Sequence, residues 1–86
     1  MNTQRILLVE DEPKVSAFIK KGLEENFFEV EIAPDGKLGK SMVLSKNYDL
    51  VILDINIPEI NGLQLCKIIR ENNHNIPIMM LTALGG

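Results

Sequence analysis

Acidic side chains follow two apolar stretches of this sequence, at the point where each stretch ends. Glu10 and Asp11 come directly after the run from Ile6 to Val9, and Asp54 comes directly after a second apolar run. Carboxylates that lie close together repel one another, and their pKa values rise. A hard divalent cation removes that repulsion, and Mg²⁺ prefers one or two carboxylates, several waters and phosphate oxygens. If the two runs are neighbouring strands, these acids can form a magnesium site.

The same residues suit phosphoryl transfer. An ionised aspartate beside Mg²⁺ is a nucleophile that can form an aspartyl-phosphate, and Asp54 is the candidate. Thr82 ends a third apolar run and could donate its hydroxyl to the transferring group. A backbone carbonyl in the loop at Asn56 could add a metal ligand. Taken singly, each acid is explained as well by solvation or by helix capping. Their coincidence at separate strand ends is what indicates a site.

The hydrophobic pattern predicts alternating strands and helices. One helix is expected to begin at Pro13, since proline suits the first helical turn. Two more are expected after the candidate caps Asp35 and Asn61. Strands rich in Val, Ile and Leu that alternate with helices indicate an α/β fold, with a parallel sheet covered on both faces. In such folds the functional site lies beyond the carboxyl ends of the strands. The expected strands are residues 5–10, 28–33, 49–54 and 76–82.

Length and charge narrow the class of protein. The chain has 86 residues, which suits one domain, and its formal net charge of −3 argues against nucleic-acid binding by this segment. The first apolar run is too short for a signal peptide, and no run approaches the length of a membrane span. We therefore expect no membrane association and a cytoplasmic location.

Three segments then carry a resemblance to a known family. ILLVEDE, DLVILDINIPEINGLQL and PIMMLTA resemble, in order and spacing, the motifs of bacterial response-regulator receiver domains, the CheY-like superfamily. The likeness covers essentially the whole chain and is greatest to receivers of the OmpR/PhoB class of winged-helix transcription regulators. It implies a flavodoxin-like, doubly wound parallel sheet with strand order 2-1-3-4.

The resemblance also implies a role for each residue of the predicted site. Asp54 resembles the phospho-acceptor, and Asp11 resembles the carboxylate that binds Mg²⁺ directly. Glu10 resembles a neighbour that acts on the metal through water, and Asn56 the residue whose main-chain carbonyl completes the metal site. Thr82 resembles the switch hydroxyl that moves toward the phosphoryl group. The implied partner is a sensor histidine kinase, and the implied module signals rather than acting as an enzyme.

A complete receiver of this family continues beyond the motif that contains Thr82. It has a fourth helix, a fifth strand with an essential lysine at its end, and a fifth helix. We therefore expect residues 1–86 to be the N-terminal part of a receiver, separated from a DNA-binding output domain. Metal binding and slow self-phosphorylation are the activities expected of it. Self-association is also expected, because the fourth strand would be an uncharged edge and Phe18 on the first helix would be uncovered.

Three other functions are weighed against this one. A Mg²⁺-dependent phosphohydrolase with an Asp nucleophile commonly needs a second Asp two residues later, and Asn56 cannot serve as that acid or base. A receiver-like interaction module that takes no phosphate is opposed by the retained acids and favoured by the absent lysine. A nucleotide-binding protein is disfavoured, because no glycine-rich phosphate loop follows the first strand.

Overall fold

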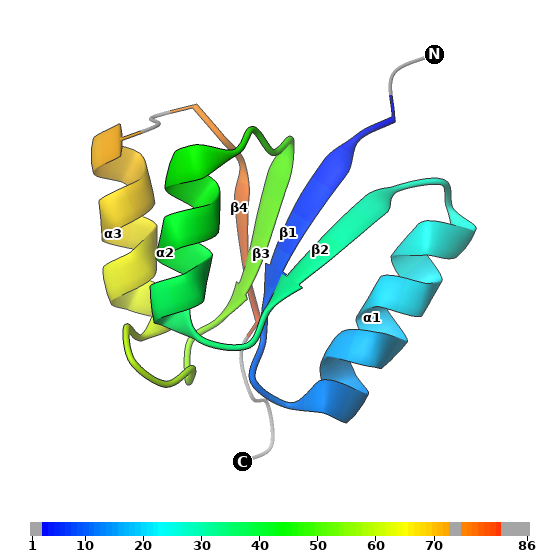
Figure 1. Ribbon diagram of the computed structural model, residues 1–86, viewed down its shortest axis with the longest axis horizontal. Coiled ribbons are helices and arrows are strands. Elements are labelled where there is room, and N and C mark those ends of the chain that lie inside the picture. Colours follow the sequence, from blue (N-terminus) through cyan, green and yellow to red (C-terminus); the bar gives the residue numbers. More distant parts are fainter. Residues whose placement is uncertain (1–2, 73–74, 82–86) are drawn as a thin grey trace.

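The computed structural model describes residues 3–72 and 75–81 and shows a parallel sheet between helices (Figure 1). The four strands lie in the order β2-β1-β3-β4, and each neighbouring pair is parallel. The predicted fold class and strand order are therefore confirmed. Along the chain the elements are β1 (Arg5–Val9), α1 (Pro13–Glu25), β2 (Glu29–Ala33), α2 (Gly36–Ser45), β3 (Leu50–Asp54), α3 (Gly62–Asn72) and β4 (Ile78–Leu81).

The sheet has a core on each face. Side chains alternate along a strand, so Leu7 and Val9 of β1 join the core beneath α2 and α3. Ile6 and Leu8 face the other way and pack in the core beneath α1. All four side chains are almost fully buried, as expected for the centre of a doubly wound sheet. Figure 1 shows α2 and α3 on one face and α1 on the other.

The strands are shorter than the sequence predicted. β1 ends at Val9 rather than Glu10, although the Glu10 N–H still donates to the Ala33 carbonyl at 3.0 Å. β4 begins at Ile78, two residues later than predicted, directly after Pro77, which has no N–H to give to a sheet. The second and third strands each begin one residue late. Thr82, the predicted last residue of the fourth strand, lies outside the described residues.

The predicted helix starts are confirmed by their caps. Pro13 stands in the first turn of α1, and the Asp35 carboxylate accepts a hydrogen bond from the Leu38 N–H at 2.7 Å. Asn61 and Gln64 cap α3 reciprocally, each side chain accepting from the other's backbone N–H at 2.9 and 3.2 Å. Such caps stabilise a helix by about 1 kcal/mol each. None of the helices in the described ranges is long and apolar enough to cross a membrane.

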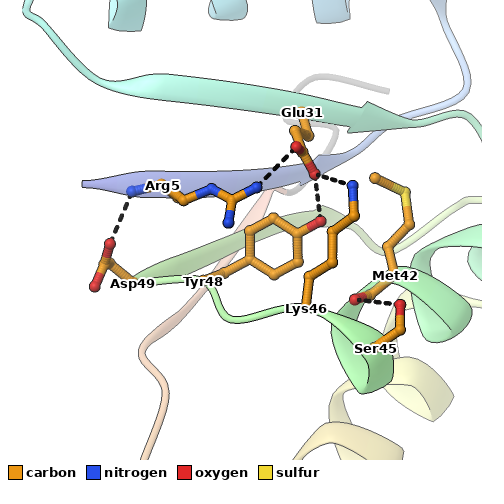
Figure 2. Close-up of polar contacts among 7 residues, drawn as sticks. All are labelled: Arg5, Glu31, Met42, Ser45, Lys46, Tyr48 and Asp49. Atoms are coloured by element: carbon orange, nitrogen blue, oxygen red, sulfur yellow. Dashed lines mark hydrogen bonds and ion pairs between the residues drawn. The ribbon is translucent and has the colours of Figure 1, made fainter. Parts of the chain in front are cut away.

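A polar cluster joins β2 to the connection between α2 and β3 (Figure 2). The Glu31 carboxylate accepts from the Tyr48 hydroxyl at 2.5 Å, and it also pairs with Arg5 at 3.0 Å and Lys46 at 3.3 Å. The hydrogen bond from Tyr48 is the main cause that holds the pKa of Glu31 below its ordinary value. Arg5 also lies over the Tyr48 ring, and its backbone N–H donates to Asp49. These contacts fix the end of the sheet at which β1 and β3 begin.

Two apolar surfaces stay open within residues 3–72 and 75–81. β4 has β3 as its only strand neighbour there, and its residues Ile78–Leu81 carry no charge. Met79 of β4 is 52 % exposed, and Phe18 of α1 is 79 % exposed. An apolar edge strand without charged residues is a template for pairing with another chain.

We expect the 86-residue chain to self-associate at micromolar concentration, because this edge can pair with a second copy. Light scattering should give a mass above the 9.7 kDa of one chain. Met79→Lys should shift the mass toward the monomer, since a charge on an edge strand opposes pairing. Lys67→Met, on the exposed surface of α3, is a control that should not lower the mass. A monomeric native chain would contradict the prediction.

Candidate metal centre

The sheet topology brings the predicted acids together. β1 and β3 are parallel neighbours, and Val9 lies beside Leu53 in their register. Glu10 and Asp11 follow β1, while Asp54 ends β3, so all three emerge at one edge of the sheet. One carboxylate oxygen from each residue lies within 4.8 Å of the others. Three hard oxygen ligands can therefore reach a single point.

The three carboxyl groups differ in burial. Glu10 is 5 % exposed, Asp54 is half-buried and Asp11 is exposed. The pKa of Glu10 is raised from its ordinary 4.5 to about 7, mainly by burial and also by a hydrogen bond between Glu10 and Asp54. The Glu12 N–H donates to Glu10 Oε1 at 3.3 Å and acts in the opposite direction. Without a cation, the Glu10 carboxyl thus retains its proton to near neutral pH.

This cluster has the chemistry of a site for a hard divalent cation. A cation can take the place of the proton that Glu10 otherwise retains, because it neutralises the same buried charge. The exposed Asp11 leaves one side open to water, and Mg²⁺ keeps several waters when proteins bind it. The residues present therefore fit Mg²⁺.

The loop after β3 is built tightly against the cluster. The Asn56 N–H donates to Asp54 Oδ1 at 3.1 Å, so the loop backbone orients the carboxylate. At the other end of the loop, the Gly62 N–H donates to the Ile55 carbonyl at 2.9 Å. A Cβ atom on Gly62 would overlap the Asp54 carbonyl oxygen and lie 2.7 Å from the Ile55 Cα. Only glycine permits this close return of the chain, which explains the residue type at position 62.

The middle of the loop contacts both the core and the start of α2. The side chain of Ile57 is buried in the core beneath α2 and α3, and Ile60 packs against the same core. Glu59 between them has φ of 73°, in the left-handed region that non-glycine residues seldom adopt. The Pro58 carbonyl accepts a hydrogen bond from the Gly36 N–H of α2 at 3.0 Å. This contact could not be predicted from the sequence, because residue spacing does not reveal which helix end meets which loop.

Comparisons with known proteins agree with this geometry. The family model for the response regulator receiver domain matches residues 6–86. The chain belongs to the response regulator receiver family. Among curated receiver proteins, it is 42 % identical over 81 residues to the transcriptional regulatory protein CusR of Escherichia coli K12. It is 46 % identical over 79 residues to the response regulator ArlR of Staphylococcus saprophyticus. These relatives are OmpR/PhoB-class regulators, as the sequence predicted.

The matches cover most of this receiver chain but only part of the relatives. They cover 94 % and 92 % of this chain, and 36 % of the length of CusR and of ArlR. The chain therefore spans about a third of these regulators. Its fold also matches solved receivers, including the response regulator TrrA of Thermotoga maritima in complex with Mg²⁺-BeF. That match has a TM-score of 0.92 and 40 % identity, and it covers 96 % of this chain and 72 % of TrrA.

The raised pKa of Glu10 predicts how the stability of the metal-free receiver depends on pH. A raised folded-state pKa gives stability that is fully present below the unfolded value near 4.5 and is lost as pH rises through about 7. The shift corresponds to at most ~3 kcal/mol. Glu10→Gln should remove this decline, because the amide stays neutral.

Urea unfolding at pH 5 and pH 8, with a chelator present, measures the difference. Glu12→Gln is the control, since it removes an exposed carboxylate two residues away and should leave the decline in place. An equal loss of stability in the native chain and in Glu10→Gln would show that Glu10 is not the titrating group.

Proposed function

We propose that this chain is the phospho-accepting receiver module of a two-component response regulator. Asp54 takes a phosphoryl group from a sensor histidine kinase, with Mg²⁺ bound beside it. The observation that carries the proposal is the convergence of Glu10, Asp11 and Asp54 at the carboxyl ends of two central strands. Membership of the receiver family supports the same reading.

The proposed ligands divide by position. Asp11 and Asp54 would bind the metal directly, Glu10 would act through water, and the main-chain carbonyl of Asn56 would complete the set. The exposed Asp11 and the half-buried Asp54 suit direct ligation with room for water, and the burial of Glu10 suits a supporting place behind them. Bound Mg²⁺ supplies positive charge that offsets the negative charge on the transferring phosphoryl group.

In the proposed reaction a carboxylate oxygen of Asp54 attacks the phosphorus of a phosphohistidine. A phosphorus–oxygen bond forms, the phosphorus–nitrogen bond breaks, and its electron pair returns to the imidazole nitrogen. The Asn56 N–H holds the Asp54 carboxylate in position for this attack, because it donates to Oδ1. Thr82 remains the proposed switch hydroxyl. The chain itself is a signalling module that receives a phosphoryl group and releases no product.

The surface beside the site suits a protein partner. α1 begins two residues after Asp11, and its exposed face presents Val15, 41 % exposed, and Phe18, 79 % exposed. The solved complex of the histidine kinase ThkA with TrrA, 39 % identical to this chain, supports a kinase as partner. Control of DNA binding and transcription by the whole regulator, and a cytoplasmic location, belong to the same proposal, since the relatives are transcriptional regulators.

Mg²⁺ binding should depend on Asp11. Asp11→Asn should weaken it by about 1–3 kcal/mol, because a charge-assisted contact is lost. Binding to the native chain should tighten as pH rises through about 7, since Glu10 then loses its proton. Isothermal titration at pH 6 and pH 8 measures both effects, with Glu12→Gln as the matched control. Unchanged affinity in Asp11→Asn would remove Asp11 from the site.

Phosphorylation should depend on Asp54. Incubation with acetyl phosphate and Mg²⁺ should add one phosphoryl group to the native chain, and Asp54→Asn should abolish the addition because the nucleophile is lost. Asp49→Asn is a suitable control, because Asp49 precedes the same strand at its other end. Intact-mass spectrometry measures incorporation. A native chain that binds Mg²⁺ but takes up no phosphoryl group would favour a receiver-like interaction module instead.

A further inference from the structure

The start of α2 meets the loop that carries the proposed metal ligand Asn56. Gly36, the first residue of α2, donates its N–H to the Pro58 carbonyl at 3.0 Å. The first N–H groups of a helix have no partner within the helix, so this bond satisfies one of them. Asp35 satisfies another through its contact with Leu38. The loop is thus attached at Pro58 to a helix end that lies 22 residues earlier in the sequence.

The contact leaves no room for a side chain at position 36. A Cβ atom on Gly36 would overlap the Ile60 carbonyl oxygen and lie 2.7 Å from the Ile60 carbonyl carbon. Both are backbone atoms, so no rotamer change can relieve the overlap and the loop itself must move. Gly36 has no positive φ that would require glycine, so its residue type is explained by space alone.

The other glycines of the helices differ in what surrounds them. A Cβ atom on Gly39, also in α2, would meet side-chain atoms of Val9 and Leu65 at 3.0 to 3.3 Å. A Cβ atom on Gly22 of α1 would meet nothing within 4 Å. An alanine at position 36 would therefore contact the loop backbone, and one at position 39 would contact side chains of the core. An alanine at position 22 would have no close neighbour.

We infer that Gly36 is a positioning residue for the metal centre. Its contact with Pro58 and Ile60 fixes the position of the loop backbone. That position determines where Asn56 lies relative to Asp54. Through this contact, α2 controls Mg²⁺ affinity although it contributes no ligand. The inference rests on the proposed Mg²⁺ site and adds a residue to it.

A purely structural role would give a different result. If the contact only stabilised the fold, Gly36→Ala would lower the free energy of unfolding and leave the metal affinity of the folded chain unchanged. If the contact positions the loop, the affinity itself falls. Substitutions that disturb the supports of metal ligands typically weaken metal binding by about 10- to 100-fold.

The test is titration of Mg²⁺ alone into the native chain and three variants at pH 8, with urea unfolding measured in parallel. Gly36→Ala should bind Mg²⁺ about 10-fold more weakly. Gly39→Ala should keep its affinity whatever its stability, and Gly22→Ala should keep its affinity and lose no stability, since alanine is favoured over glycine inside a helix. Equal affinities in Gly36→Ala and the native chain would overturn the inference and leave the proposed function standing. A native chain that binds no Mg²⁺ would overturn the proposed function itself.

A measurement on the native chain covers the case in which Gly36→Ala does not fold. Coupling between two sites is reciprocal, so Mg²⁺ at the acids should strengthen the contact at Gly36. Saturation with Mg²⁺ should therefore slow hydrogen exchange at the Gly36 amide and leave that of Gly22 unchanged. An unchanged Gly36 amide in a chain that demonstrably binds Mg²⁺ would overturn the inference.

Discussion

The buried carboxyl group of Glu10, held against Asp54, is the constraint on which the rest of the site depends. Charged groups are seldom buried without a compensating partner, because leaving water costs several kcal/mol. Within the described residues, no lysine or arginine is among the groups that shift the pKa of Glu10. A proton or a bound cation can supply the compensating charge. The acids at the carboxyl ends of β1 and β3 therefore suit a bound cation.

The two ends of the sheet handle charge in opposite ways. Where β1 and β3 begin, Glu31 is neutralised by Arg5 and Lys46 and hydrogen-bonded by Tyr48 (Figure 2). That cluster is complete, so it fixes the structure and has no need of a ligand. At the carboxyl ends of the same strands, the acids have one another for neighbours. The contrast supports the proposal that a cation binds at the carboxyl ends of the strands.

The site also combines two kinds of support. Its carboxylates stand at the ends of strands whose central side chains are buried, so their positions are as rigid as the sheet. The remaining proposed ligand stands on a loop, which needs anchors of its own. Ile57 in the core, Gly62 at the return of the chain and Gly36 at the end of α2 provide them. The proposed site thus draws on elements that contribute no ligand.

Much of this protein could be predicted from its sequence. The apolar runs and caps gave the alternation of strands and helices, because periodicity and capping are local properties of the chain. The acids at strand ends, together with the receiver motifs, identified Glu10, Asp11 and Asp54 as candidates. The exact limits of the strands were less well predicted, since hydrogen bonds to neighbouring strands decide them.

Tertiary structure alone decided the rest. The pairing of β1 with β3 brings the acids together. The packing of the folded chain also determines that Glu10 is buried and Asp11 is exposed. The attachment of the loop to Gly36 was likewise invisible in the sequence. In the sequence alone, a glycine at a helix start gives no sign of such a contact. It becomes informative only when the fold brings another backbone against it, because such contacts depend on the packing of elements far apart in the chain.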